Sequence, residues 1–148
     1  MDHMMDQKTR IHPPKKIGAS MIKKDELALA KLWNDAYAAG LKAGNECNPK
    51  PMGIGLAKGL FSNEIVPGTL SIVPEGVCGF AWVKIKGTTP FARWAKKTGI
   101  AHPHCYGGYE IWCRDFGQSM QRKEAWAGAV AKVLTENGIE AFADSRMD

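Results

Sequence analysis

The chain has 148 residues, of which 45% are hydrophobic and 24% charged, and its formal net charge is +5. These values are typical of one soluble globular domain and exclude a disordered or fibrous chain. No apolar run approaches the roughly 18 to 20 residues that cross a bilayer, and the N-terminus lacks a signal-peptide core, so we expect a cytoplasmic protein without membrane contact.

Residues 1–19 are polar and basic and have no hydrophobic period. This pattern predicts a flexible basic N-terminal arm, which we separate from a single folded domain over 20–148. The first four residues look like an expression remnant ahead of Met5. The positive charge either keeps the chain in solution or contacts nucleic acid, although no arginine-rich or aromatic-interleaved motif accompanies it.

A first helix is predicted over 24–43 by apolar residues at helical spacing. Gly44 and Asn45 can end it, because glycine adopts the left-handed conformation without strain. The residues that carry the periodicity are Leu29, Leu32, Trp33, Ala36 and Gly40.

Residues 45–76 are rich in glycine and proline. Because a structureless loop of this length is uncommon, we predict a functional flap that holds a short strand at 69–73. Gly53 and Gly55 resemble the start of a phosphate-binding loop, but no strong strand precedes them and no Lys-Ser pair follows, which favours ordinary turns.

The pattern over 77–86 predicts a central strand, and a helix follows from its N-cap Thr89 to about Lys97. A loop is then expected at 100–105 and a second strong strand at 108–114.

The last helix is expected over 119–137, with Ala125, Ala129, Val130, Val133 and Leu134 buried. Small residues on it, including Gly128, would allow close approach to a sheet. Gly138 ends the helix, and 139–143 forms a third strand, reached by a crossover of the length that a right-handed β-α-β unit needs.

The sequence therefore predicts an α/β or α+β fold, with an N-terminal helix followed by the order β-α-β-α-β. We expect a small sheet of three to four strands with the helices packed mainly on one face.

The turn and helix start at 117–123 form the main candidate site. Ser119 and free backbone N–H groups could donate to an anion, Gln118 could add an amide, and Arg122 could supply a bidentate fork beside Lys123. In the alternative, Ser119 only caps the helix and both cations point into solvent.

Three further side chains are candidates for the same ligand. Tyr106 and Trp112 could stack a nucleobase or could pack in the core. Arg146 could join Arg122, or could pair locally with an aspartate of the predicted C-terminal tail 144–148.

Metal and nucleophile chemistry are weakly indicated. A cluster at His102, His104 and Cys105 has metal-ligand residue types, to which folding could add His12, Cys78 and Cys113, but zinc spacing is missing. A catalytic thiolate at Cys78 or Cys105 with His102 or His104 as its base is another alternative, but the spacing does not show that the thiol and the base come together. We expect four reduced cysteines, no metal, no cofactor and no catalytic residue, because no carboxylate pair or serine triad is apparent.

Several strings in the chain resemble a family of small uncharacterised proteins encoded by tailed bacteriophages, over about residues 25–148. The resemblance implies an accessory protein in the cytoplasm of a bacterial host, where such proteins often inhibit host functions or counter defence. It supplies no activity and no catalytic residues. The strings are Gly76-Val-Cys-Gly-Phe-Ala-Trp-Val83, Phe91-Ala-Arg-Trp94, Tyr106-Gly-Gly108, Gly117-Gln-Ser119, Arg122-Lys-Glu-Ala125 and Ser145-Arg-Met-Asp148.

Three functions follow as hypotheses. The first is a non-enzymatic binder of an anionic small ligand such as a nucleotide. The second is a module that binds or inhibits a host protein through exposed aromatic side chains. The third is a nucleic-acid binder, whose affinity would fall steeply with salt. The oligomeric state is left open.

Overall fold

The computed structural model describes residues 19–148, and the side chains from 25 onward. The arm predicted over 1–19, with the expression remnant predicted at its start, lies outside the described residues, apart from Ala19, which begins the first helix. The three helices of this part of the chain are α1 (Ala19–Glu46), α2 (Pro90–Lys97) and α3 (Met120–Glu136). The strands are β1 (Met52–Ile54), β2 (Ser71–Val73), β3 (Gly79–Ile85), β4 (His102–Pro103), β5 (Tyr109–Trp112) and β6 (Ala141–Met147).

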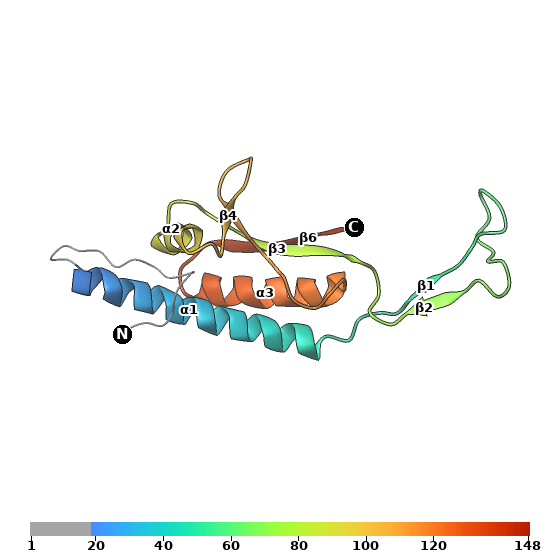
Figure 1. Ribbon diagram of the computed structural model, residues 1–148, viewed down its shortest axis with the longest axis horizontal. Coiled ribbons are helices and arrows are strands. Elements are labelled where there is room, and N and C mark those ends of the chain that lie inside the picture. The colour runs from blue at the N-terminus through green and yellow to red at the C-terminus, as the bar shows by residue number, and fades with distance from the viewer. Residues whose placement is uncertain (1–18) are drawn as a thin grey trace.

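The main sheet has four strands in the order β4-β5-β3-β6, and each neighbouring pair is antiparallel. α3 packs against β3 and β6, and α1 packs on α3, so both long helices lie on the same side of the sheet (Figure 1). The molecule is therefore an α+β fold with helices packed on a sheet, which confirms the predicted class.

The predicted order, a helix followed by β-α-β-α-β, needs correction because it leaves out the three short strands β1, β2 and β4. The predicted β-α-β unit also differs. β5 and β6 are both antiparallel to β3, so they run in the same direction, but β3 lies between them. From β3 onward the order is β-α-β-β-α-β with a split β-α-β unit, as in ferredoxin-like folds.

Alternation along β3 builds the core. Ala81, Val83 and Ile85 are buried toward the helices, whereas the residues between them are half-buried on the opposite face. Trp126 and Leu134 on α3 are buried against this layer. The inward side chains of the strand are apolar and pack on an apolar helix face. A shift of one residue would turn them to the other face of the sheet, so this pattern fixes the register.

The prediction for the buried face of α3 was wrong in part. Ala125, Ala129 and Val133 are only half-buried, and Gly128 is exposed with open space around it. The close approach occurs instead at Gly40 of α1, where a Cβ would lie 2.7 Å from Cδ1 of Trp126. A glycine at this position lets the two helices pack closely.

Several predicted boundaries shift. The Thr89 cap is confirmed, because its hydroxyl accepts a hydrogen bond from the backbone N–H of Ala92. The predicted loop at 100–105 contains β4, and the predicted tail 144–148 is wrong because β6 continues to Met147, paired with β3.

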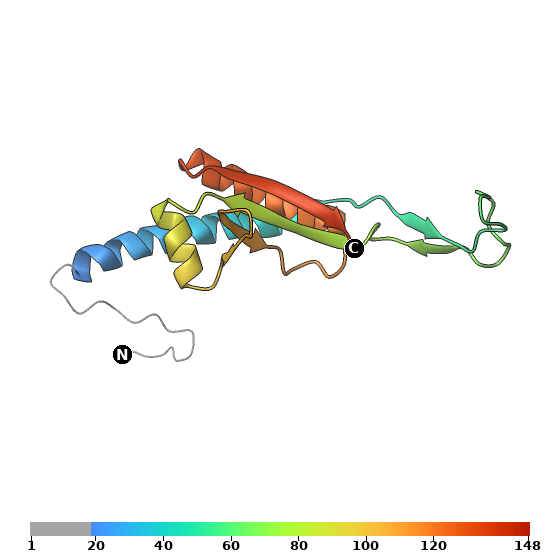
Figure 2. The same cartoon turned by 90° about the horizontal axis from the view of Figure 1, so that it is seen from above.

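The segment 45–76 contains a β-hairpin, which we call the apolar hairpin and define as residues 52–73. Its strands β1 and β2 pair antiparallel, with Met52 opposite Val73. The sequence predicted a strand at 69–73 but not its partner β1. Figures 1 and 2 both show the hairpin extending away from the main sheet, so it does not close over the body of the protein as a flap.

Candidate functional site

The corner at the start of α3 is built by a tight left-handed turn. Phe116 and Gly117 have φ of 70° and 56°, a conformation that suits glycine and is uncommon for phenylalanine. Beyond them, the backbone N–H of Gly79 donates to Gln118 O, and that of Met120 donates to Val77 O. These two bonds tie the turn to the beginning of β3.

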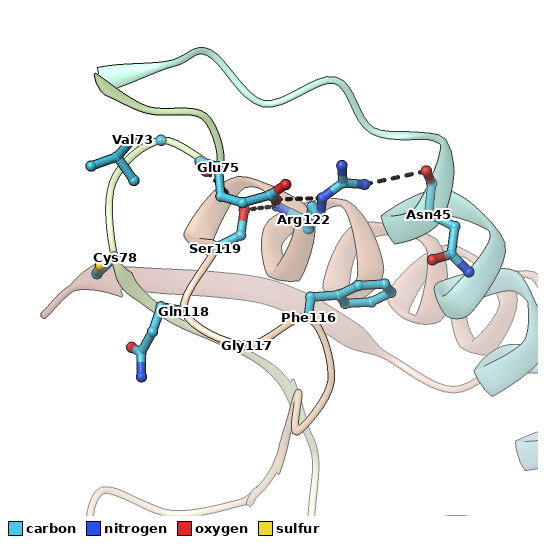
Figure 3. Close-up of a pocket in the computed structure, with 10 residues that line it drawn as sticks. Asn45, Val73, Glu75, Cys78, Phe116, Gly117, Gln118, Ser119 and Arg122 are labelled. Carbon is cyan, nitrogen blue, oxygen red and sulfur yellow. Dashed lines mark hydrogen bonds and ion pairs between the residues drawn. The ribbon is translucent and has the colours of Figure 1, made fainter. Parts of the chain in front are cut away.

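A hollow of about 530 Å³ opens at this corner (Figure 3). Three of the predicted contacts, Gln118, Ser119 and Arg122, line it together with residues from the base of the hairpin and the end of α1. In Figure 3 the side chain of Gln118 points away from Arg122. The other lining residues are Asn45, Val73, Glu75, Gly76, Cys78, Phe116 and Gly117.

The guanidinium of Arg122 already has acceptors within the protein. Its Nε donates to Oε1 of Glu75 at 2.6 Å, and its Nη1 donates to the carbonyls of Gly44 at 2.7 Å and Asn45 at 3.2 Å. The hydrogen bond to Glu75 is the main cause that raises the pKa of Arg122. Arg122 therefore joins the last turn of α1, the turn between β2 and β3 and the first turn of α3.

The first amides of α3 are also largely satisfied internally. Ser119 is 2% exposed; its hydroxyl donates to Glu75 O at 3.0 Å and accepts from the backbone N–H of Arg122 at 3.4 Å. The N–H of Lys123 donates to Ser119 O. Ser119 is thus an N-cap, and the donors that it would offer to a ligand are used by the protein.

Lys123 does not point into the hollow. Its buried Nζ donates to Gly79 O at 3.2 Å and lies 5.4 Å from the ring centroid of Phe80. A carbonyl dipole and an aromatic face stabilise this cation in place of an acidic partner. The position of Lys123 makes it a link between α3 and β3.

The other three candidates lie apart from the hollow. Tyr106 is exposed in the β4–β5 turn, and Trp112 lies on the sheet face opposite α3. Arg146 is on β6, with its guanidinium carbon 5.4 Å from the centroid of the Phe80 ring. The structure therefore brings Gln118, Ser119 and Arg122 together and leaves Lys123, Tyr106, Trp112 and Arg146 outside that group.

The histidines beside the β4–β5 turn have partners as well. Nδ1 of His104 accepts from the backbone N–H of Tyr106 at 3.1 Å, and Nε2 lies 3.1 Å from Oε2 of Glu110. Because Nδ1 acts as acceptor, the proton of the neutral ring belongs on Nε2, facing the carboxylate. His102 Nε2 lies 3.2 Å from Arg114. Neither histidine is positioned as a free base for Cys105.

All four cysteines are separate thiols. Within residues 19–148, no group of three or more histidine, cysteine or acidic side chains is arranged to hold a metal ion.

The apolar hairpin is the feature that residue-by-residue motif analysis missed. It carries seven of the eleven large hydrophobic side chains that are exposed in the described chain. Leu60 and Phe61 at its tip are 91% and 95% exposed. The signal in the sequence was the apolar content between the glycines and prolines of 45–76, in residues that no helix or long strand could bury. The seven are Ile54, Leu56, Leu60, Phe61, Ile65, Leu70 and Ile72.

Comparison with protein-family models, with curated proteins and with solved structures gave no match to this chain. None of the helices that the structure describes combines the length and apolar character needed to cross a membrane.

Proposed function

We propose that this protein is a non-enzymatic interaction module that docks a partner protein through the apolar hairpin. The observation that carries the proposal is the concentration of exposed apolar side chains on a hairpin that projects from the body. Contiguous apolar surface of this kind marks interaction sites in stable proteins. Tip residues as exposed as Leu60 and Phe61 contribute nothing to the core of the free protein.

The chemistry of the hairpin favours a protein as the occupant. Lys58 and Glu64 are the charged residues within 52–73, and their side chains pair at 3.4 Å, so the hairpin attracts neither phosphate nor cations. Among the described strands, these two pair only with each other, which leaves one backbone edge of each strand for a strand of the partner. Added strands and apolar anchors are a common mode of protein recognition.

The resemblance to phage-encoded proteins gives the partner a class. A phage accessory protein acts in the cytoplasm of the infected cell, so the partner would be a host protein whose activity the hairpin blocks or redirects. The body of the molecule then serves as a rigid base, since Arg122 and Glu75 tie the root of the hairpin to α3.

Co-purification from a host lysate tests this function. We expect one stoichiometric partner that is lost in the double variant Leu60→Asp, Phe61→Asp and retained in the control Leu27→Asp, which changes a 70% exposed leucine on α1. Retention of the partner by the hairpin variant, or equal loss in the control, would contradict the proposal. A hairpin-dependent dimer of this chain, detected by light scattering, would assign the hairpin to a second copy instead.

A second candidate function, binding of an anionic ligand such as a nucleotide, is supported by the hollow at Gln118, Ser119 and Arg122. Here a phosphate would have to displace the carboxylate of Glu75 from Arg122. We expect inorganic phosphate or a nucleotide to raise the melting temperature, and Gln118→Ala and Arg122→Lys to reduce that rise. No shift across a nucleotide panel would exclude this function.

A further inference from the structure

The sheet face opposite α3 carries aromatic and basic side chains, and none of the described helices packs across it, although Lys123 of α3 reaches the Phe80 ring. Alternation along β3 places Phe80, Trp82 and Lys84 on this face, away from the buried row that contacts the helices. Figure 1 shows α1 and α3 together on the other side, and Figure 2, seen from above, shows β3 and β6 in front of α3. This open face is independent of the apolar hairpin.

Three aromatic rings are grouped on the two central strands of the open face. Trp82 on β3 lies opposite Trp112 on β5, and their rings stack with centroids 4.7 Å apart. Phe80 meets Trp112 edge to face at 5.8 Å. All three side chains are half-buried, so each keeps part of its surface accessible. A fourth ring, Phe142 on β6, is 59% exposed.

A hollow of about 540 Å³ continues this surface at one end of the sheet. Lys84 and Phe142, which are direct cross-strand neighbours, line it together with the end of β3 and residues of two glycine-containing loops, 86–88 and 107–108. In one of these loops a Cβ on Gly108 would lie 2.7 Å from Ile85 O, so glycine keeps the loop close to β3. The hollow therefore places an ammonium group beside an exposed ring.

The open face carries both signs of charge. Glu110 is buried, where it accepts from Nε1 of Trp112 and contacts His104, and the exposed Asp144 accepts from the backbone N–H of Ser145. Neither Lys84 nor Arg146 makes a salt bridge within the described part of the chain, and Arg146 lies over the Phe80 ring. Each of these cations is the cross-strand neighbour of a ring, Lys84 of Phe142 and Arg146 of Phe80, with Asp144 opposite Trp82 between them.

We infer that the open face binds single-stranded nucleic acid. Bases would stack on Phe142 and on the Phe80, Trp82 and Trp112 group, and phosphates would contact Lys84 and Arg146. Unpaired bases expose their faces to aromatic side chains, whereas a duplex keeps them stacked inside, so a sheet surface of this kind selects single strands. The inference rests on this cross-strand pairing of rings with cations and on the grouped rings, rather than on the fold, which hosts many functions.

The test measures binding of fluorescent oligo-dT, oligo-U and a duplex to the full chain over a range of salt concentrations. We expect single strands to bind more tightly than the duplex, with tryptophan fluorescence quenched. Comparing dT with U distinguishes DNA from RNA as the ligand. Phe142→Ala should weaken binding about tenfold without changing the salt dependence, because it removes one stacking surface. Lys84→Gln should lower the slope of log K against log salt by about 0.7.

Matched controls separate the open face from the rest of the chain. Phe61→Ala removes an exposed ring on the apolar hairpin, and Lys132→Gln removes an exposed cation on α3; both should bind as the unmodified protein does. Near-UV circular dichroism of each variant checks that the fold is intact. Failure to bind either oligomer at low salt would overturn the inference, as would equal affinity for the duplex. Binding that is unchanged in Phe142→Ala and Lys84→Gln but lost in Lys15→Gln, Lys16→Gln would assign it to the N-terminal residues and also overturn it.

Discussion

The carboxylate of Glu75 forms a salt bridge with the guanidinium of Arg122, with Oε1 2.6 Å from Nε. The residues lie 47 positions apart, and the contact closes the root of the apolar hairpin onto the first turn of α3. An internal carboxylate thus sits where the positive end of the helix dipole and a guanidinium would favour an anion. Any ligand at this corner has to compete with it.

Removing the charge of Glu75 should therefore open the corner. We expect Glu75→Gln to bind inorganic phosphate more tightly than the unmodified protein, measured by calorimetry, because Arg122 would lose its charged partner. Glu64→Gln removes the same charge from the hairpin and should leave phosphate affinity unchanged. Equal or weaker phosphate binding by Glu75→Gln would show that Arg122 is a structural residue and that the hollow takes no anion.

Two glycine-to-alanine substitutions should have opposite effects on stability. At Gly40 the added Cβ would meet Trp126 at 2.7 Å, and we expect overpacking to destabilise the fold by about 1 to 3 kcal/mol. This exceeds the gain of about 1 kcal/mol or less that alanine brings to a helix. At Gly128 no atom lies within 4 Å, so the helix gain should appear alone. Urea unfolding measures both; similar effects at the two sites would contradict the described packing of α1 on α3.

The hydrogen bond from Tyr37 to Asp115 should make stability fall at alkaline pH. Its Oη donates to Oδ2 at 2.6 Å, and this bond, followed by burial, raises the pKa of Tyr37 from 10.0 to about 12. Between these values the native state keeps a proton that the unfolded state has lost, so the contribution is complete below pH 10 and is lost as pH rises through 12.

Tyr37→Phe isolates this effect. The variant should be less stable at neutral pH by about 1.5 to 3 kcal/mol, because a hydrogen bond to a charged group is lost. The difference between the two proteins should then shrink as the pH rises from 10 to 12, as followed by denaturant unfolding at each pH. A difference that stays constant over this range would mean that the phenol and the carboxylate are not coupled.

The four thiols should differ in reactivity. Cys113 is buried, and burial raises its pKa from 9.0 to about 11, whereas Cys78 and Cys105 are exposed. Because the thiolate is the reactive form, we expect iodoacetamide to modify Cys78 and Cys105 first and Cys113 last in the native protein. Peptide mass spectrometry over time gives the order, and early labelling of Cys113 would contradict its burial in the core.

Local sequence signals were sufficient to predict where α2 and α3 begin. Thr89 and Ser119 are N-caps because their hydroxyls satisfy the first helix amides, and this depends on a few neighbouring residues. The pairing of β1 with β2 was not predicted, since three-residue strands among glycines and prolines carry almost no periodicity. β6 was predicted too short because Asp144, Ser145 and Arg146 are polar, as an edge strand permits.

The candidate site was only partly predictable for a different reason. The sequence indicates that Arg122 lies in the first turn of a helix, but not that Glu75, Gly44 and Asn45 satisfy its donors, because these contacts span 47 to 78 positions. Similarly, the sequence shows that Trp82 and Trp112 are on strands, whereas their stacking depends on the register of β3 with β5. Long-range pairing decides which polar groups remain for a ligand.

Photo-crosslinking tests most directly whether the apolar hairpin docks a partner protein. A photoreactive phenylalanine analogue replaces Phe61 at the hairpin tip or, as control, Leu27 on α1, in living cells of the proposed bacterial host. We expect the probe at position 61 to give one protein adduct of defined mass that the probe at position 27 does not give. No adduct at position 61, or the same adducts at both positions, would contradict the proposed function.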